Sequence, residues 1–464
     1  MIGRPGRVRT ALGAAVGVAA LAGMVPLWAA TESHAVDSVT RFLIAVAVIL
    51  VTCQALAALA RRFHQPSVLG EMVGGLLLGP SLLGALWPGG GALLFPPSVL
   101  EGLDKMAQLG LVVFVFLLGC ELRTDRIERK GVVGAAVIGG MALPCAAGMG
   151  IVFVTGDLFA GTSDAPVETM LFVGLAMAVT ALPVLARLLA DLKLERTSIG
   201  ALSLSAAAIG DGLLWLSLAF LLAGQGASGH GLRIVLLATA LVIVTALCVR
   251  PLLAVLVRKL GSNQSLAVVL VSGAIGYSAL TQAIELHPVV GAFLFGVAVP
   301  RNSPAVERIS ERLEGFTLIV LLPVFFAGVG LKASVGLLGT APLAWLVLLV
   351  VLVAAVVTKL VGAGGAVRLA GLPAAEALRF GVLMNCRGVT ELVVLTIGHE
   401  AGLINQLAYT VLVLVAVITT AATGPLVRWS MRRSPDFGTA LPIPTPPPVG
   451  AGTRAGGEGS TAAG

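Results

Sequence analysis

Asp211 is the residue of this sequence whose surroundings most clearly indicate chemistry. It lies in the apolar segment IGDGLLWLSLAFLL, and no other charged residue occurs between Arg196 and Arg233. An ionisable side chain at membrane depth is costly, so such a residue commonly has a functional role. A buried carboxylate can hold a proton or a hard cation, but not both at once. We therefore predict competitive binding at Asp211. The alternative is a structural Asp that is hydrogen-bonded to small neighbours.

A second polar cluster lies in FGVLMNCRGVTELVVLTIG, where Asn385, Arg387, Thr390 and Glu391 interrupt an apolar run. Arg387 and Glu391 are four residues apart, so they are neighbours on one face if the helix continues. As a pair inside the membrane, each would relieve the desolvation cost of the other. Gly388 and the polar run favour a local break in the helix. The pair either takes part in transport or only stabilises the bundle.

A third segment, AMAVTALPVLARLL, places Thr180 and Pro183 in the middle of an apolar run. Proline removes a backbone donor and leaves carbonyl groups free, which the membrane tolerates only at a cavity or inside protein. Free carbonyls and a hydroxyl at such a break can coordinate ions. This segment and the second cluster are each followed by one more apolar span. That correspondence is typical of a secondary transporter with inverted repeats.

The composition defines the elements that must position these residues. Charged residues make up 11% of the 464 positions, hydrophobic residues 57%, and the mean hydropathy is +1.01. A soluble domain carries about 25% charged residues, and a disordered chain is poor in apolar residues. A transmembrane β-barrel would show short alternating strands rather than long apolar runs. The sequence therefore predicts an all-α polytopic membrane protein.

Apolar runs long enough to cross a bilayer recur along the chain, because a spanning helix needs about 20 mostly apolar residues. We find 14 candidate spans: 10–30, 41–60, 66–84, 104–121, 132–155, 168–189, 198–223, 233–257, 265–283, 286–300, 315–331, 340–361, 376–398 and 408–428.

Basic residues gather in alternate loops, which supports this count. Twenty fall on one side, against Arg41, Lys105, Arg233 and Lys332 on the other. The positive-inside rule places the richer side, and with it the C-terminus, in the cytoplasm. The twenty are Arg61, Arg62, Arg123, Arg126, Arg129, Lys130, Arg187, Lys193, Arg196, Arg258, Lys259, Arg301, Arg308, Arg312, Lys359, Arg368, Arg379, Arg428, Arg432 and Arg433.

The two ends of the chain differ from its middle. Residues 1–39 have three arginines followed by an apolar stretch, which suits either an additional N-terminal helix or a cleaved signal peptide. Residues 431–464 are rich in Pro, Gly, Ser and Thr and predict a disordered cytoplasmic tail. The transmembrane domain is expected over 40–430. No GxGxxG or P-loop motif occurs, so we expect no nucleotide-binding domain in the chain.

Several long motifs resemble those of the monovalent cation:proton antiporter-2 family. This family includes bacterial Na⁺(K⁺)/H⁺ exchangers, the membrane part of Kef-type potassium efflux systems and plant cation/H⁺ exchangers. The resemblance covers roughly residues 40–430. It is carried by QPSVLGEMVGGLLLGPSLLG (65–84), LGLVVFVFLLGCEL (109–122), VTALPVLARLLADLKLERTSIGALSLSAAAIGD (179–211), HPVVGAFLFGVAVPR (287–301), LLPVFFAGVGLK (321–332) and MNCRGVTELVVLTIG (384–398).

The resemblance implies 13 helices, divided between a dimerisation part and a core part that alternate along the chain. It implies two crossed, discontinuous helices, here around Thr180–Pro183 and Asn385–Glu391. It also implies that Asp211 is the carboxylate that binds the ion and the proton. Access would alternate by an elevator-like movement of the core against a homodimeric scaffold.

One position departs from the family pattern. The family commonly has Asp-Asp or Asn-Asp where this chain has Gly210-Asp211, so one ligand and one charge are missing. No lysine occurs within the span 315–331, where some electrogenic relatives carry one. Both absences favour exchange of one charge for one proton, which is electroneutral.

We therefore predict exchange of Na⁺ or K⁺ for H⁺ in the cell membrane by a protein that is not an enzyme. It would need no cofactor, no metal beyond the transported cation and no nucleic acid; its partners are the two substrates, the lipid bilayer and a second copy. Two alternatives remain open: a channel-like K⁺ efflux component, and a proton-coupled exporter of another cation.

Overall fold

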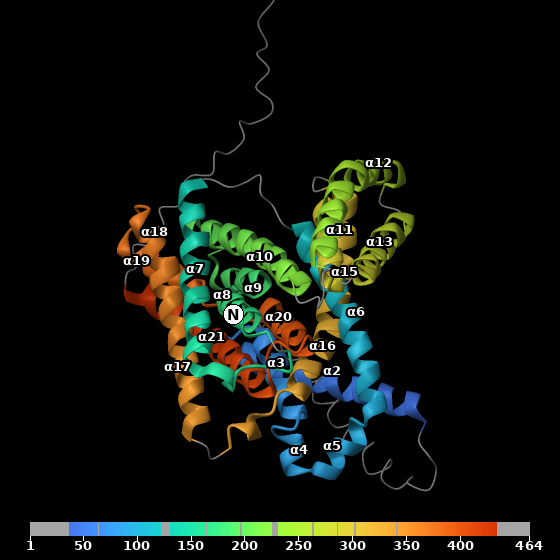
Figure 1. Cartoon of the computed structure of the whole chain (residues 1–464). Helices are drawn as coiled ribbons and strands as arrows, with labels where there is room; N and C mark the ends of the chain where they lie inside the picture. Colours follow the sequence, from blue (N-terminus) through green and yellow to red (C-terminus); the bar gives the residue numbers. More distant parts are fainter. Residues whose placement is uncertain are drawn as a thin grey trace, which may run out of the picture.

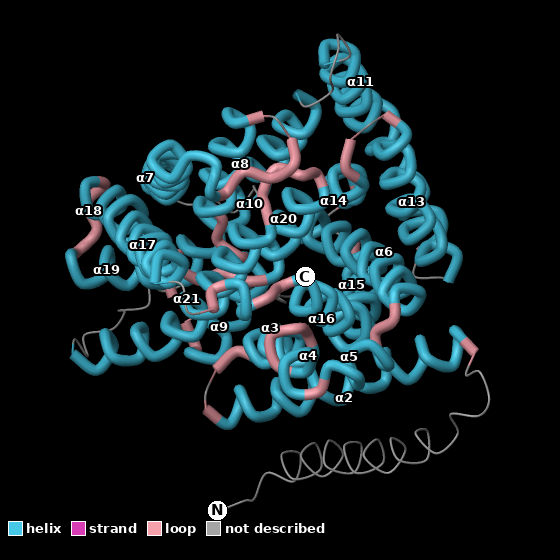
Figure 2. The backbone as a smooth tube through the Cα atoms, turned by 60° about the horizontal axis from the view of Figure 1, so that its bottom comes forward, coloured by secondary structure: helices cyan, strands magenta, loops and turns pink. Residues whose placement is uncertain are grey.

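The protein is helical wherever its structure is described. A computed structural model describes residues 37–63, 65–121, 130–163, 165–194, 197–224, 231–261, 264–284, 286–300, 303–339 and 342–433. Figure 2 shows these residues as helices joined by loops, with no strand among them. An isolated antiparallel bridge joins Ala160 and Ile404. The predictions for the N-terminal segment and the C-terminal tail lie outside the described residues, apart from a few at their inner edges.

The helices follow the expected spans in order. The first half contains α2 (Ser38–Arg62), α3 (Ser67–Leu78), α4 (Leu83–Leu86), α5 (Pro88–Leu94), α6 (Pro97–Glu121), α7 (Lys130–Thr155), α8 (Pro166–Ala178), α9 (Leu182–Leu192), α10 (Ser198–Gly224), α11 (Gly231–Val244) and α12 (Arg250–Leu260). The second half contains α13 (Gln264–Ala283), α14 (Pro288–Ala298), α15 (Pro304–Phe316), α16 (Leu322–Lys332), α17 (Pro342–Lys359), α18 (Gly365–Leu369), α19 (Ala374–Leu383), α20 (Val389–Glu400) and α21 (Gln406–Arg433). Single π turns join α11 to α12, α15 to α16 and α17 to α18.

Within the described residues, 11 helices are long and apolar enough to cross a membrane. The shorter apolar helix α14 and the pair α19 and α20 account for the two remaining spans expected after residue 40. The predicted all-α polytopic fold is therefore confirmed.

The helices pack as two groups that alternate along the chain. One group, the scaffold, contains α2, α3, α6 and α13 to α16; the other, the core bundle, contains α7 to α10 and α17 to α21. Members of each group pack mainly against one another, and α11 and α12 connect the groups. In both views α7, α17 and α18 lie on the side of the molecule opposite α6 and α13 (Figures 1 and 2).

Burial separates the helices at the centre of the core bundle from those at its surface. Helix α20 is buried on nearly every side, from Val389 to Gly398. Helix α17 is equally apolar but exposes one long face. An apolar helix that is exposed in this way is suited to lipid. The exposed face consists of Leu343, Leu346, Leu349, Val350, Val353 and Val357.

The two ends of the bundle differ in charge. Because successive spans run in opposite directions, the C-terminal turns of α2, α12, α18 and α21 lie at one end, which we call the basic end. It carries Arg61, Arg62, Arg258, Lys259, Arg368, Arg428 and Arg432. In Figure 1, α12 is at the top of the molecule, and α4 and α5 are at the bottom.

Two basic residues predicted in cytoplasmic loops are buried inside the bundle instead. Lys359 is the last residue of α17 and only 1% exposed, and the chain continues as helix to Leu369. Arg379 lies within α19, is buried, and donates from Nη2 to the carbonyl of Ser430 at 3.3 Å. The prediction ended the span near Lys359, although the apolar run LVGAGGAV continues after it. The lysine is therefore a residue of the bundle interior.

Candidate functional site

The break between α8 and α9 comes directly before Pro183. Val179 and Ala181 have extended backbone conformations, with ψ of 144° and 102°, and α9 begins at Leu182. Proline has no N–H to bond to the carbonyl four residues earlier, here that of Val179, so it does not continue α8, yet it is well suited to the first turn of a new helix. Pro183 is the second residue of α9. The interruption around Thr180 therefore follows from the local sequence.

The break between α19 and α20 covers residues 384–388. Gly388 caps the N-terminus of α20 where the chain approaches α9 closely. A Cβ atom at this position would lie 2.7 Å from Cγ2 of Val184, which is closer than carbon atoms can pack. A glycine is therefore required at this point of the crossing.

The two breaks are in direct contact. The backbone amide of Ala181 donates to the carbonyl of Cys386 at 3.0 Å. The hydroxyl of Thr180 donates to the carbonyl of Met384 at 2.9 Å. Each interrupted helix thus satisfies polar groups that the other leaves free, as backbone at membrane depth requires. The two interrupted helices cross at this point.

Arg387 and Glu391 form a completely buried ion pair at the crossing. Nη1 of Arg387 lies 2.6 Å from Oε1 of Glu391, and both side chains are 0% exposed. The guanidinium also donates to the carbonyls of Ala176 at 3.3 Å and Met177 at 2.8 Å, at the C-terminal end of α8. A cation is favourable at a helix C-terminus, because carbonyl groups there have no partner within the helix. Arg387 therefore links the two interrupted helices.

Lys359 provides a second cation at the same helix end, and the sequence analysis missed it. Its Nζ donates to the carbonyl of Ala178 at 2.6 Å and to the hydroxyl of Thr180 at 2.8 Å. Thr180 thus accepts from the lysine and donates to the other break, so its hydroxyl bridges Lys359 and the second interrupted helix. The continuing apolar run after Lys359 was the signal that could have placed this lysine inside the bundle.

Asp211 faces the crossing from α10. Its side chain is buried, and neither carboxylate oxygen has a hydrogen-bond partner. It lies close to the backbone amide of Leu182 at the start of α9, and a carboxylate is favourable at a helix N-terminus. Lys359 acts on it electrostatically but makes no hydrogen bond to it. A buried carboxylate without a partner is costly, so it is well suited to take up a proton or a cation.

A small cavity lies next to Gly210, between α7, α10, α17 and the crossing, with about 230 Å³ of empty space when any part open to solvent is counted. The side chain of Met141 is the nearest neighbour that a Cβ atom at Gly210 would meet, with Sδ at 3.7 Å. There is consequently space for a side chain at the position where the resemblance leads us to expect a second polar residue. The lining includes Met141, Ala178, Thr180, Gly210, Lys359 and Met384.

The remaining predicted residues lie at the same crossing, but with different environments. Nδ2 of Asn385 donates to the carbonyl of Gly381 at 3.0 Å, and its Oδ1 has no partner. The hydroxyl of Thr390 and Oε2 of Glu391 are also buried without partners. The structure therefore brings the two predicted segments and Asp211 into one region. Which of their oxygens bind an ion stays a prediction.

This fold and site define a class of protein. Two interrupted helices that cross in a membrane bundle, beside a buried carboxylate, are the arrangement of secondary transporters with inverted repeats. The model of the transmembrane sodium/hydrogen exchanger family matches residues 44–433. The chain belongs to this family, which consists of transporters and not of enzymes.

Individual relatives agree with the family. The chain is 37% identical to cation/H⁺ antiporter 20 of Arabidopsis thaliana over 83% of this chain and 48% of that protein. It is 33% identical to the Na⁺/H⁺ antiporter NhaS4 of Synechocystis over 82% of this chain and 95% of that protein. The chain thus spans about half the length of the plant relative.

The fold also has a match among solved structures. The sodium proton antiporter MjNhaP1 of Methanocaldococcus jannaschii superposes with a TM-score of 0.62 at 17% identity. The match covers 85% of this chain and 98% of MjNhaP1. At this level of identity the likeness shows a common fold.

Proposed function

We propose that this protein exchanges a monovalent alkali cation, Na⁺ or K⁺, for H⁺ across a membrane. Asp211 binds the cation and the proton alternately, so the site carries the cation across the membrane in one direction and the proton in the other. The observation that carries the proposal is the buried Asp211 carboxylate, whose oxygens have no partner although a helix crossing lies beside it. The family supports it, since the named relatives are cation/H⁺ and Na⁺/H⁺ antiporters.

The other charges of the crossing have partners within the protein, which leaves Asp211 for the substrates. Arg387 is held by Glu391 and two carbonyls of α8, and Lys359 is held by Ala178 and Thr180. These cations offset the negative end of α8. Asp211 alone can therefore change its occupant without breaking a contact of the crossing.

In this proposal the core bundle moves against the scaffold, so that Asp211 faces one side of the membrane and then the other. The division of the helices into two groups supports such a movement. The basic end faces the cytoplasm by the positive-inside rule, which places the end of α21 there. A homodimer in the cell membrane stays a prediction of the family resemblance.

The exchange is electroneutral in this proposal, but the structure gives a different argument for it than the sequence did. The absence of a lysine from 315–331 no longer supports it, because Lys359 reaches the crossing from the next span. Lys359 is bonded to Ala178 and Thr180 and not to Asp211, so binding at Asp211 removes none of its partners. Electroneutral exchange requires that Lys359 keep the same protonation state while Asp211 exchanges one cation for one proton.

The variant Asp211→Asn tests the proposal, because it keeps the volume and removes the titratable charge. In everted membrane vesicles with a preformed proton gradient, adding Na⁺ or K⁺ should dissipate the gradient for the unchanged protein and leave it intact for the variant. Glu101→Gln is the control, since Glu101 is an exposed carboxylate paired with Lys105 on α6. Retained exchange in Asp211→Asn would contradict the assignment. Cation flux without proton movement in the unchanged protein would favour the channel-like alternative.

A further inference from the structure

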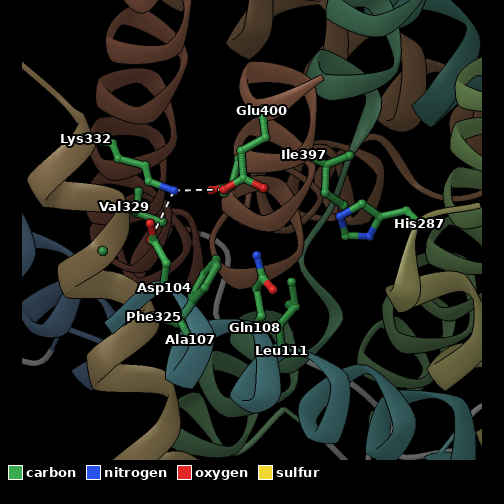
Figure 3. Close-up of a pocket in the computed structure, with 12 residues that line it drawn as sticks. Asp104, Ala107, Gln108, Leu111, His287, Phe325, Val329, Lys332, Ile397 and Glu400 are labelled. Atoms are coloured by element: carbon green, nitrogen blue, oxygen red, sulfur yellow. Dashed lines mark hydrogen bonds and ion pairs between the residues drawn. The ribbon is translucent and has the colours of Figure 1, made fainter. Parts of the chain in front are cut away.

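A cavity opens between the scaffold and the core bundle at the end opposite the basic end. Its volume is about 410 Å³, counting the open space at its mouth. Helices α6, α14 and α16 supply one wall, and α20 of the core bundle supplies the other (Figure 3). Its polar and aromatic lining includes Asp104, Gln108, His287, Phe325, Lys332 and Glu400.

Lys332 holds two carboxylates across this cavity. Its Nζ lies 3.2 Å from Oδ1 of Asp104 and 2.8 Å from Oε1 of Glu400, as the dashed lines in Figure 3 mark. Lys332 and Asp104 both belong to the scaffold, on α16 and α6, whereas Glu400 is the last residue of α20 in the core bundle. One of the two contacts therefore lies within the scaffold, and the other joins the scaffold to the core.

Further contacts near this ion pair join α16 and the chain after it to the start of α21 in the core bundle. The side-chain amide of Gln406 donates to the backbone carbonyl of Lys332. The hydroxyl of Tyr409 donates to the carbonyl of Val329 at 3.3 Å, and the amide of Ser334 donates to the hydroxyl of Thr410 at 3.2 Å. The end of α16 and the chain after it are thus bonded to α20 and the start of α21. The cavity beside this seam is not lined by Asp211, so it ends short of the site in the present structure.

We propose that the Lys332–Glu400 pair is a latch that holds the outer entrance of the transporter closed. This inference rests on the proposed function, because a core that moves against the scaffold carries Glu400 away while Lys332 stays. When the latch opens, Lys332 keeps Asp104 as its partner, so the lysine is not left without a counter-charge. Opening therefore releases the Glu400 carboxylate, which is already 39% exposed, into the water at the mouth of the cavity.

The strength of the latch is suited to a gate that must open in every cycle. The side chains of Lys332 and Glu400 are 28% and 39% exposed. An ion pair with this exposure changes an equilibrium by roughly two- to fivefold, and salt weakens it further. A fully buried pair such as Arg387–Glu391 would hold the two groups together too firmly for transport.

Glu400→Gln and Lys332→Gln test the latch by half-cycle transport measurements in right-side-out vesicles. Loosening the latch raises the population of the outward-open state, so the half-saturating cation concentration at the outer side should fall about two- to fivefold. The double variant should match the single variants, because one pair cannot be broken twice. Glu101→Gln, which removes an exposed carboxylate within the scaffold, should change nothing. An unchanged outer half-saturation in Glu400→Gln, or additive effects of the two variants, would overturn the proposal.

Cross-linking gives a second, independent measurement. In the Lys332→Cys/Glu400→Cys double variant, a short bis-methanethiosulfonate reagent, whose spacer replaces the length of the two removed side chains, should link the two thiols and stop exchange, and a reductant should restore it. The Lys332→Cys single variant is the control for the reagent. Exchange that continues with the link formed, or failure to form the link, contradicts a latch between these residues. If Asp211→Asn stops exchange while these variants behave normally, the latch alone is wrong and the proposed function stands.

Discussion

The ammonium of Lys359 is the donor for two oxygens of the crossing, the carbonyl of Ala178 and the hydroxyl of Thr180. Both oxygens lie at the end of α8 in residues that are buried, so water does not reach them easily in place of the lysine. Lys359 therefore affects the stability of the crossing, and in our proposal it does not carry the exchanged proton. Stability and the electrical character of transport can be measured separately, so the two roles can be separated.

We expect Lys359→Met to lower the free energy of unfolding by about 1–3 kcal/mol, because two buried acceptors lose their donor. Thermal unfolding of the purified protein in detergent measures this change. The residual exchange should stay insensitive to a membrane potential imposed with K⁺ and valinomycin, in the variant as in the unchanged protein. Lys105→Met, at an exposed lysine of α6, is the control.

A different electrical response would assign another role to this lysine. If exchange by the unchanged protein depends on membrane potential and Lys359→Met abolishes that dependence, then Lys359 carries a charge through the cycle. Electroneutral exchange would then be wrong, although Asp211 would keep its role.

At the residue scale, the sequence indicates Asp211 more directly than Lys359. Asp211 interrupts an apolar run with no other charge nearby, so its position alone marks it as unusual. A lysine near the end of an apolar run is the ordinary signature of a cytoplasmic boundary, and only the apolar residues after Lys359 argue against that interpretation. The contact of its ammonium with the end of α8 comes from packing alone.

At the scale of elements, local chemistry predicts both breaks but not their contact. Pro183 and Gly388 each disturb a helix through their own backbone properties, which a sequence displays directly. The hydrogen bond between Ala181 and Cys386 joins residues that are far apart in the chain. The resemblance to a known family implied the crossing. The geometry of Arg387, which donates to both α8 and Glu391, comes from the structure.

The buried pair Arg387–Glu391 should behave as one unit. Glu391→Gln and Arg387→Gln should each lower the free energy of unfolding by about 3–5 kcal/mol, since each leaves one buried charge without its partner. The double variant should lose clearly less free energy of unfolding than the sum of the two single losses, because no unpaired charge remains in it. Thermal unfolding in detergent is measured for the unchanged protein, the two single variants and the double variant, which together make up the double-mutant cycle.

The exposed pair Glu101–Lys105 is a matched control, since it has the same spacing of four residues within one helix. Its removal should leave unfolding unchanged, because solvent screens such pairs. Additive losses at Arg387 and Glu391 would mean that the carbonyls of α8, and not Glu391, hold the arginine.

At the scale of the whole molecule, each half of the chain contributes first to the scaffold and then to the core bundle. Helices α2 to α6 precede α7 to α10, and α13 to α16 precede α17 to α21. Hydropathy predicts the order of the spans but contains no information about which of them pack together. The predicted topology is unaffected by the errors at Lys359 and Arg379, because Arg368 lies between them at the basic end and the alternation of the other basic loops is unchanged.

The orientation of the molecule gives the final prediction. Lys105→Cys and Arg258→Cys introduce thiols at exposed positions at opposite ends of the bundle. With a membrane-impermeant maleimide on intact cells, the cysteine at 105 should react, and the one at 258 should react only after permeabilisation. The protein with its natural cysteines gives the background, since Cys248 is also exposed. The reverse labelling would contradict a cytoplasmic basic end. The Lys332–Glu400 latch would then close the inner entrance, because its place at the end opposite the basic residues is fixed by the fold.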